Sequence, residues 1–245
     1  MSSTANMRLI DHVKELRKRV FIAVSFTLLF AIISLNFYSV FIHFLITPFT
    51  QNLSSLSEQS LYVTSLFEGF FLKFKLSLIF GGILSLPVWL FQTVRFVFPG
   101  LKKSEKWIVS IVLFCSLLLI LFSIYMAYFK LIPFTISFMS SSGFIPDSVG
   151  TLMNFKQNIT YIVQLIFFAC LLFQLPLLVQ LLLALNLVTR KQLLRSSKVV
   201  ILLILVICAL VTPPDFISQI CLALPLILFY FLTIGIAKLF GWGNG

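Results

Sequence analysis

Charge is scarce in this sequence, and acidic charge is the scarcest. Only 10% of the 245 residues are charged, with 7 Asp and Glu against 18 Lys and Arg. Soluble domains carry roughly a quarter charged residues, whereas this chain is 60% hydrophobic with a mean hydropathy of +1.11. No soluble core can bury so much apolar surface, so the composition excludes a soluble globular protein and indicates a membrane protein.

Signatures of enzymes and metal sites are also missing. The sequence contains no HExxH, GxSxG, P-loop or glycine-rich dinucleotide motif. Its four cysteines fall inside apolar segments without CxxC or Cys/His spacing: Cys115, Cys170, Cys208 and Cys221. We interpret them as small core residues rather than disulfides or metal ligands. We therefore expect no catalytic residue, no cofactor and no metal.

Six apolar segments follow one another along the chain. They cover residues 20–46, 70–98, 107–131, 159–185, 199–211 and 216–240. A helix of about 20 apolar residues crosses the roughly 30 Å hydrocarbon core of a bilayer with its backbone hydrogen bonds satisfied internally. The sequence therefore predicts an all-α, polytopic membrane protein with six transmembrane helices, forming a single domain over residues 1–245.

Basic residues gather in alternate connections between these segments. The three clusters are Arg8, Lys14, Arg17, Lys18 and Arg19; Lys102, Lys103 and Lys106; and Arg190, Lys191, Arg195 and Lys198. By the positive-inside rule, both termini, including the N-terminal segment 1–19, face the cytoplasm. Because these cations anchor the topology, the formal charge of +11 does not indicate a nucleic-acid-binding surface.

The fifth segment is short. Its 14 residues Val199 to Thr212 precede Pro213 and Pro214, and at 1.5 Å per residue they span about 21 Å of a roughly 30 Å core. Asp215 then stands where an N-cap carboxylate would start the sixth helix. We expect short fifth and sixth helices beside a locally thinned membrane.

Prolines interrupt several apolar segments. Pro87, Pro176 and Pro225 each remove one backbone hydrogen bond and favour a kink. Curved helices predict a concave arrangement, open to a partner arriving from the lipid. At the start of the second segment, Glu68 is placed to cap the helix with Thr64 or Ser65, and Lys73 and Lys75 can extend toward the interface.

Two carboxylates, Glu15 and Glu105, stand inside basic clusters. In one interpretation they are ion-pair partners of their neighbours, such as Glu15 with Arg19 at i, i+4. In the other they receive the guanidinium groups of a basic peptide, which carboxylates bind in a bidentate fork. Deeper in the membrane, Gln174 is suited either to an interhelical hydrogen bond or to a polar group on a partner helix.

Six motifs together resemble the TatC family, the receptor subunits of the twin-arginine protein translocase. They are HVKELRKR at 12–19, TSLFEGFFLKFKLSL at 64–78, SLPV at 85–88, FVFPGLKKSEK at 96–106, FQLPLLV at 173–179 and TPPDFISQ at 212–219. The resemblance implies a glove-like helix arrangement and export of folded proteins driven by the proton-motive force. It also implies single-span TatA and TatB partners and self-association in a receptor complex.

The resemblance also implies roles for residues. The residues it implies for signal-peptide binding are Glu15, Leu16, Arg17, Phe96, Pro99, Leu101, Lys103 and Glu105. Those it implies for partner docking or translocation are Gln174, Ala209, Thr212 and Asp215, and those with implied structural roles are Pro48, Glu68 and Pro87. Many members have Glu where this chain has Gln174, which favours a hydrogen-bonding role over a proton-linked one. The family often has Gly where Ser123 aligns, and the segment from Lys130 to Ser142 also differs.

Membrane lipids are expected partners, and nucleic acid is not. The expected location is the bacterial cytoplasmic membrane, with a plastid thylakoid or mitochondrial inner membrane as the alternative. A small-solute or ion transporter is the competing function, but it needs polar groups along a path, and few lie deep in the segments. An intramembrane enzyme needs a paired nucleophile and base, which we do not find.

Overall fold

The computed structural model describes residues 2–52, 61–63, 65–97, 103–139, 153–212 and 216–243. These residues are almost entirely helical. The helices are α1 (Ser2–Asn36), α2 (Tyr38–Asn52), α3 (Leu66–Val97), α4 (Lys103–Met126), the π-helix η1 (Ala127–Leu131), α5 (Ile132–Met139), α6 (Phe155–Leu172), α7 (Leu175–Ala184), α8 (Arg190–Val211) and α9 (Phe216–Leu239). Two-residue strands, β1 (Leu61–Tyr62) and β2 (Met153–Asn154), pair in parallel.

Within the described residues, six helical stretches are long and apolar enough to cross a membrane. They are Asp11–Asn36, Phe67–Phe96, Ser110–Phe138, Phe155–Ala184, Arg190–Val211 and Ser218–Leu239. The predicted six-helix membrane fold is thus confirmed. The last two stretches have 22 residues each, against 26 to 30 for the others, so the fifth and sixth helices are the short ones, as expected.

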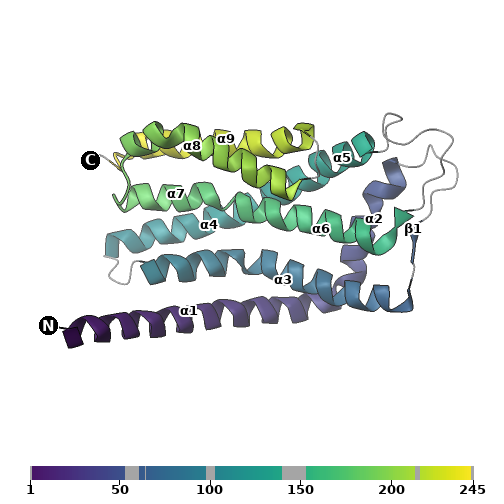
Figure 1. Cartoon of the computed structure of the whole chain (residues 1–245), viewed down its shortest axis with the longest axis horizontal. Coiled ribbons are helices and arrows are strands. Elements are labelled where there is room, and N and C mark those ends of the chain that lie inside the picture. Colours follow the sequence, from purple (N-terminus) through teal and green to yellow (C-terminus); the bar gives the residue numbers. More distant parts are fainter. Residues whose placement is uncertain are drawn as a thin grey trace.

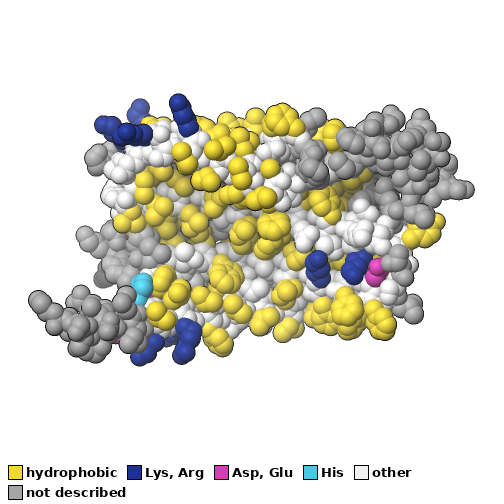
Figure 2. Space-filling model, viewed as in Figure 1, with side chains coloured by type: hydrophobic (Ala, Val, Ile, Leu, Met, Phe, Trp, Pro, Cys, Tyr) yellow, Lys and Arg dark blue, Asp and Glu magenta, His cyan; other side chains and the backbone are white. Residues whose placement is uncertain are grey.

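Both chain ends lie at the same end of the bundle (Figure 1). That end also holds the start of α1, the end of α3, the start of α4 and the start of α8. The three basic clusters of the sequence belong to these segments, so the alternation of charge follows the fold. Figure 2 shows apolar side chains over the middle of the bundle and most Lys and Arg toward its ends.

The first span ends earlier than predicted. We expected it to continue to Ile46, but α1 stops at Asn36, and the Phe37 amide bonds the Ser34 carbonyl at 3.1 Å. The 26 residues of this span already reach about 39 Å, more than the bilayer core requires. The remaining apolar residues form α2, which crosses the far end of the bundle (Figure 1).

The third and fourth spans contain irregular turns. In the third, α4 passes into η1 and α5, so the helix continues past its predicted end at Leu131. In the fourth, Phe173 and Gln174 form a turn between α6 and α7, and Pro176 lies in the first turn of α7. Pro176 therefore marks a break, whereas Pro87 and Pro225 lie inside continuous helices.

Helix α8 is longer than its apolar stretch. Its 22 residues extend about 33 Å, enough to cross a bilayer core. The first nine residues, Arg190 to Lys198, hold all four of its basic side chains. A capping box between Thr189 and Gln192 starts the helix. The short segment seen in the sequence is thus the inner part of a longer helix with a cationic start.

The fourth span lies at the centre of the packing. Of its most apolar window, 61% is buried, against 11% for α8 and 17% for the first span. Its fully buried residues include Ile159, Val163, Cys170 and Phe173. Phe173 also contacts the rings of Phe122 and Phe229, with centroids 5.7 and 5.8 Å away. This span joins α3 and α4 on one side to α9 on the other.

Candidate functional site

Glu15, near the start of the first span, is held by an arginine. Its Oε1 accepts hydrogen bonds from Nε of Arg19, at 3.1 Å, and from Nη2 of the same guanidinium. The side chain of Glu15 is 33% exposed and that of Arg19 15%. The predicted i, i+4 ion pair is confirmed. No described group donates a hydrogen bond to Oε2, so this oxygen has capacity for another donor.

Helix α1 meets the end of α3 beside this carboxylate. The rings of His12 and Phe96 stack with centroids 4.5 Å apart, and His12 lies one turn before Glu15. Leu16, which is 42% exposed, and Arg17 stand on the open surface of α1. The structure therefore brings four of the predicted signal-peptide residues to one rim of the bundle: Glu15, Leu16, Arg17 and Phe96.

The other predicted rim residues are less fully described. Lys103 and Glu105 lie in the first turn of α4, and their side chains fall outside the described part of the structure. Pro99 and Leu101 lie outside the described residues, as does Asp215 at the start of the sixth helix. Glu105 is the third residue of α4, and the start of α4 lies at the same end of the bundle as the start of α1 (Figure 1).

Gln174 is buried between the third and fourth spans, with 5% of its surface exposed. The Ser116 hydroxyl donates to its Oε1 at 2.6 Å, and its Nε2 donates to the Cys170 carbonyl at 3.4 Å. Cys170, one turn before Gln174, also accepts a hydrogen bond at its sulfur from Ser123 of the third span, at 3.1 Å. An interhelical hydrogen bond is thus the observed role of Gln174. Ser116 is the partner that inspection of the sequence missed, because nothing in its neighbourhood singles it out.

All four cysteines are free, and Cys170 and Cys208 are buried. Among the described residues, no group of three His, Cys, Asp or Glu side chains could hold a metal ion.

The outer surface of α8 faces away from the bundle. Ala209 is exposed and Leu210 is 82% exposed, while Thr212 is buried and donates to the Cys208 carbonyl at 3.0 Å. On the inner side α9 is its principal neighbour: Gln219 donates to the Leu205 carbonyl and Tyr230 to that of Leu193. The helix therefore presents an unpartnered apolar face at membrane depth.

The residues predicted to be structural occupy three different settings. Pro48 is buried in α2, and Pro87 lies half-buried inside α3. Glu68 stands in the first turn of α3, where its amide bonds the Ser65 carbonyl at 3.0 Å. A carboxylate in a first turn is stabilised by the helix dipole. Lys73, five residues further along α3, lies 5.7 Å from the centre of the Tyr38 ring.

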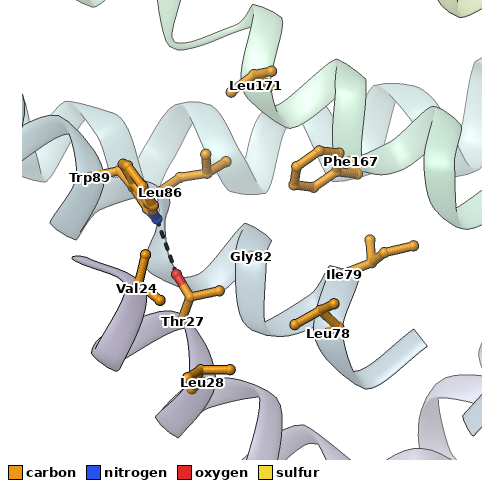
Figure 3. Close-up of a pocket in the computed structure, with 10 residues that line it drawn as sticks. All are labelled: Val24, Thr27, Leu28, Leu78, Ile79, Gly82, Leu86, Trp89, Phe167 and Leu171. Atoms are coloured by element: carbon orange, nitrogen blue, oxygen red, sulfur yellow. Dashed lines mark hydrogen bonds between the residues drawn. The ribbon is translucent and has the colours of Figure 1, made fainter. Parts of the chain in front are cut away.

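The surface is hollowed between α1, α3 and α6 (Figure 3). The hollow measures about 520 Å³, and its walls are apolar apart from Thr27, which accepts a hydrogen bond from Trp89 Nε1 at 3.0 Å. Thr27 also bonds Ser85 at 2.8 Å. Glu15 and Val24 are nine residues apart, half a turn out of phase on α1, so the rim and this hollow lie on different flanks.

Comparisons with known proteins identify the chain's family. The family model described as "Sec-independent protein translocase protein (TatC)" matches residues 11–225. The chain belongs to the TatC family. It is therefore a multi-pass membrane protein of the Tat protein-transport pathway, a component of a protein translocase.

Individual relatives agree over almost the whole length. The chain is 30% identical to TatC of Carboxydothermus hydrogenoformans, covering 95% of this chain and 93% of that protein. It is 30% identical to TatC of Aquifex aeolicus, with 95% of each covered, and to TatCy of Bacillus subtilis, with 95% and 89% covered.

A solved structure supports the same fold. The crystal structure titled "Twin Arginine Translocase Receptor- TatC in DDM" matches with a TM-score of 0.79 at 30% identity, covering 93% of this chain and 99% of that one. The resemblance drawn from the six sequence motifs is thus confirmed for the family and for the fold.

Proposed function

We propose that this TatC-family chain is the receptor for twin-arginine signal peptides, and that the rim formed by α1 and the end of α3 is the binding site. The observation that carries the proposal is the Glu15 carboxylate. It already holds one guanidinium through Oε1 and leaves Oε2 without a described donor. An incoming arginine can bind Oε2 or replace Arg19, using the same charge-assisted geometry.

Arginine rather than lysine suits this site for a physical reason. A guanidinium is planar and presents paired donors, so it can share a carboxylate with Arg19 in a fixed geometry, whereas an ammonium is a compact and strongly hydrated point charge. Arg17 and the other cations of the segment repel a basic ligand unless it gains a specific bond. Glu105, at the same end of the bundle, is proposed as the second carboxylate, with Pro99, Leu101 and Lys103 around it.

The test is capture of a signal peptide in membranes that contain the protein. We expect a photo-crosslinkable peptide with two arginines to be captured in preference to the same peptide with two lysines. Loss of a hydrogen bond to a charged group costs about 1.5–3 kcal/mol, so Glu15→Ala should weaken arginine capture about tenfold or more. Glu105→Ala should have a similar effect.

Asp11→Ala is the matched control. Asp11 lies on the same helix and pairs with Lys14 at 3.9 Å, but both side chains are more than two-thirds exposed. This variant removes one carboxylate from the same rim and should leave the arginine preference unchanged. Equal capture of both peptides by the parent protein, or equal losses in Asp11→Ala and Glu15→Ala, would show that the assigned site is wrong.

We further propose that α8 docks single-span partners of the TatA or TatB kind. The support is its exposed apolar surface around Ala209 and its low burial of 11%. Gln174, already bonded to Ser116, is proposed to stabilise the bundle during translocation rather than to carry protons. The energy for transport is proposed to come from the proton-motive force, and the receptor is proposed to self-associate.

The proposed location is the bacterial cytoplasmic membrane, with both termini in the cytoplasm. Cysteine accessibility tests the orientation: Lys198→Cys should react with an impermeant thiol reagent only in inverted vesicles, and Lys156→Cys only in intact cells. The reverse pattern would overturn the orientation. A solute transporter is disfavoured because the hollow of Figure 3 is apolar and its polar groups are already bonded to one another.

A further inference from the structure

A second hollow, of about 490 Å³, lies where α8 begins and α9 ends. Three cations line it: Arg190 and Lys191 from α8, and Lys238 from the last turn of α9. We refer to it as the basic hollow. It lies at the end of the bundle that holds both chain termini, where Figure 2 shows Lys and Arg side chains gathered above α8 and α9.

No acidic side chain in the described part of the chain balances the charge of the basic hollow. None of its three cations forms an ion pair with a described acidic side chain. From residue 148 onward the sequence contains a single acidic residue, Asp215, which follows the last residue of α8 rather than its cationic start. Three neighbouring cations repel one another, so an anion that enters the hollow gains three attractive interactions and relieves this repulsion.

The walls change from cationic to apolar in the direction of the membrane. Leu194 lies one turn inward from Arg190 on α8, and Ile234 lies one turn inward from Lys238 on α9. Phe240 and Trp242, in the turn that leads to Gly243, stack with ring centroids 5.0 Å apart, and aromatic rings of this kind favour the membrane interface. A ligand that fits both the cationic and the apolar wall has an anionic group at the end of the bundle and a hydrocarbon chain that extends toward the membrane interior.

The C-terminal turn holds the basic hollow in a fixed shape. Gly243 donates its amide hydrogen to Asn186 Oδ1 at 2.8 Å, and its carbonyl accepts from the Arg190 amide at 3.2 Å. Gly243 has φ +66°, and an added Cβ would lie 2.8 Å from Leu183 Cδ2. Because Gly243 and Thr189 already accept from the first amides of α8, the side chains, rather than the helix end, are free to bind an anion.

We propose that the basic hollow binds the phosphate of an anionic phospholipid headgroup, with an acyl chain along Leu194 and Ile234. Basic pockets between membrane helices suit such headgroups. A zwitterionic lipid is a poorer ligand, because its own cation meets the same three charges. A soluble anion is also poorer, because it makes no use of the apolar wall. The site fixes the α8–α9 pair at the interface while leaving the outer face of α8 open.

The test measures quenching of Trp242 by brominated lipids. Trp89→Phe and Trp107→Phe leave Trp242 as the single tryptophan, since the chain has three. In phosphatidylcholine nanodiscs, a small fraction of brominated phosphatidylglycerol should quench Trp242 more strongly than the same fraction of brominated phosphatidylcholine. A cation near a headgroup contributes roughly a fivefold preference, so the double substitution Lys191→Gln and Lys238→Gln should remove most of the difference.

The matched control is Lys18→Gln with Lys198→Gln, which removes two cations from the same end of the protein without touching the basic hollow. It should keep the preference. Both double variants change exposed side chains, and retained elution as a single species confirms that they are folded. A parent without preference, a preference kept in the Lys191 and Lys238 variant, or an equal loss in both variants would overturn the proposal.

Two further ligands separate the remaining alternatives. Inorganic phosphate at constant ionic strength should not displace brominated phosphatidylglycerol; displacement would mark a site for free anions and overturn the lipid assignment. A Glu-rich peptide should leave Trp242 emission unchanged; a response to the peptide without any lipid preference would mark an acidic protein partner instead. Neither result depends on signal-peptide capture at Glu15.

Discussion

The fourth and fifth spans have nearly the same mean hydropathy, 2.5 and 2.4, yet opposite environments. Of the most apolar window, 61% is buried in the fourth span and 11% in the fifth. Lipid chains and protein interiors are equally apolar, so hydropathy does not distinguish a helix surrounded by helices from one surrounded by lipid. What differs is side-chain type: the fourth span carries buried polar groups at Gln174 and Gln180, while α8 has none in its apolar part.

This difference predicts losses of very different size from the same substitution. Leu165 is 1% exposed in the fourth span, and Leu210 is 82% exposed in the fifth. Leu165→Ala should lower the free energy of unfolding by about 2–3 kcal/mol, mainly through the cavity it leaves, and Leu210→Ala should change it by less than about 0.5 kcal/mol. Steric trapping in bicelles measures both values. Similar losses at the two sites would mean that α8 is packed against protein.

The open face of α8 can be blocked without disturbing the bundle. Ala209→Trp places a large ring on the exposed surface and should reduce recovery of a TatB-type partner about tenfold, equivalent to roughly 1.4 kcal/mol. The control is Leu224→Trp, at an exposed position on α9. Partner recovery is measured by co-purification in mild detergent. A larger loss from Leu224→Trp would move the docking surface to α9.

The capping box of α8 tests how far this exposed helix depends on local interactions. Thr189 accepts from the Gln192 amide at 3.2 Å, and the Gln192 side chain accepts from the Thr189 amide at 2.9 Å. Thr189→Ala should cost about 1 kcal/mol, detected as faster hydrogen exchange in the first turn of α8. Thr189→Ser keeps the hydroxyl and should restore protection. Unchanged hydrogen exchange in Thr189→Ala would show that the C-terminal turn, without the capping box, is enough to stabilise the first turn of α8.

The smallest expected effect is the polar contact inside the fourth span. A double-mutant cycle with Ser116→Ala and Gln174→Leu should give a coupling of about 0.6 kcal/mol, the average for hydrogen bonds between membrane helices. The unfolding free energies of the four proteins supply the value. A coupling near zero would mean that the 2.6 Å bond between these side chains adds nothing net to stability.

The sequence was sufficient for the six membrane spans and the family. Six apolar stretches, alternating basic clusters and six motifs predicted the spans and the TatC assignment, because length, hydropathy and charge act locally along the chain. It was also sufficient for the Glu15 and Arg19 pair, since i, i+4 residues meet on any helix. It was not sufficient for the end of the first span at Asn36, because largely apolar sequence resumes directly after Asn36 and continues into α2.

Only the tertiary structure decided which apolar surfaces meet protein and which meet lipid. It joined Ser116 to Gln174 across 58 residues and Gly243 to Asn186 across 57, pairs for which the sequence offers no periodic signal. It also set Lys238 beside Arg190 and Lys191. The hydrophobic pattern determines that each helix lies in the membrane. The neighbours of a side chain depend instead on close packing between distant segments, and because lipid and protein interior are equally apolar, hydropathy does not specify that packing.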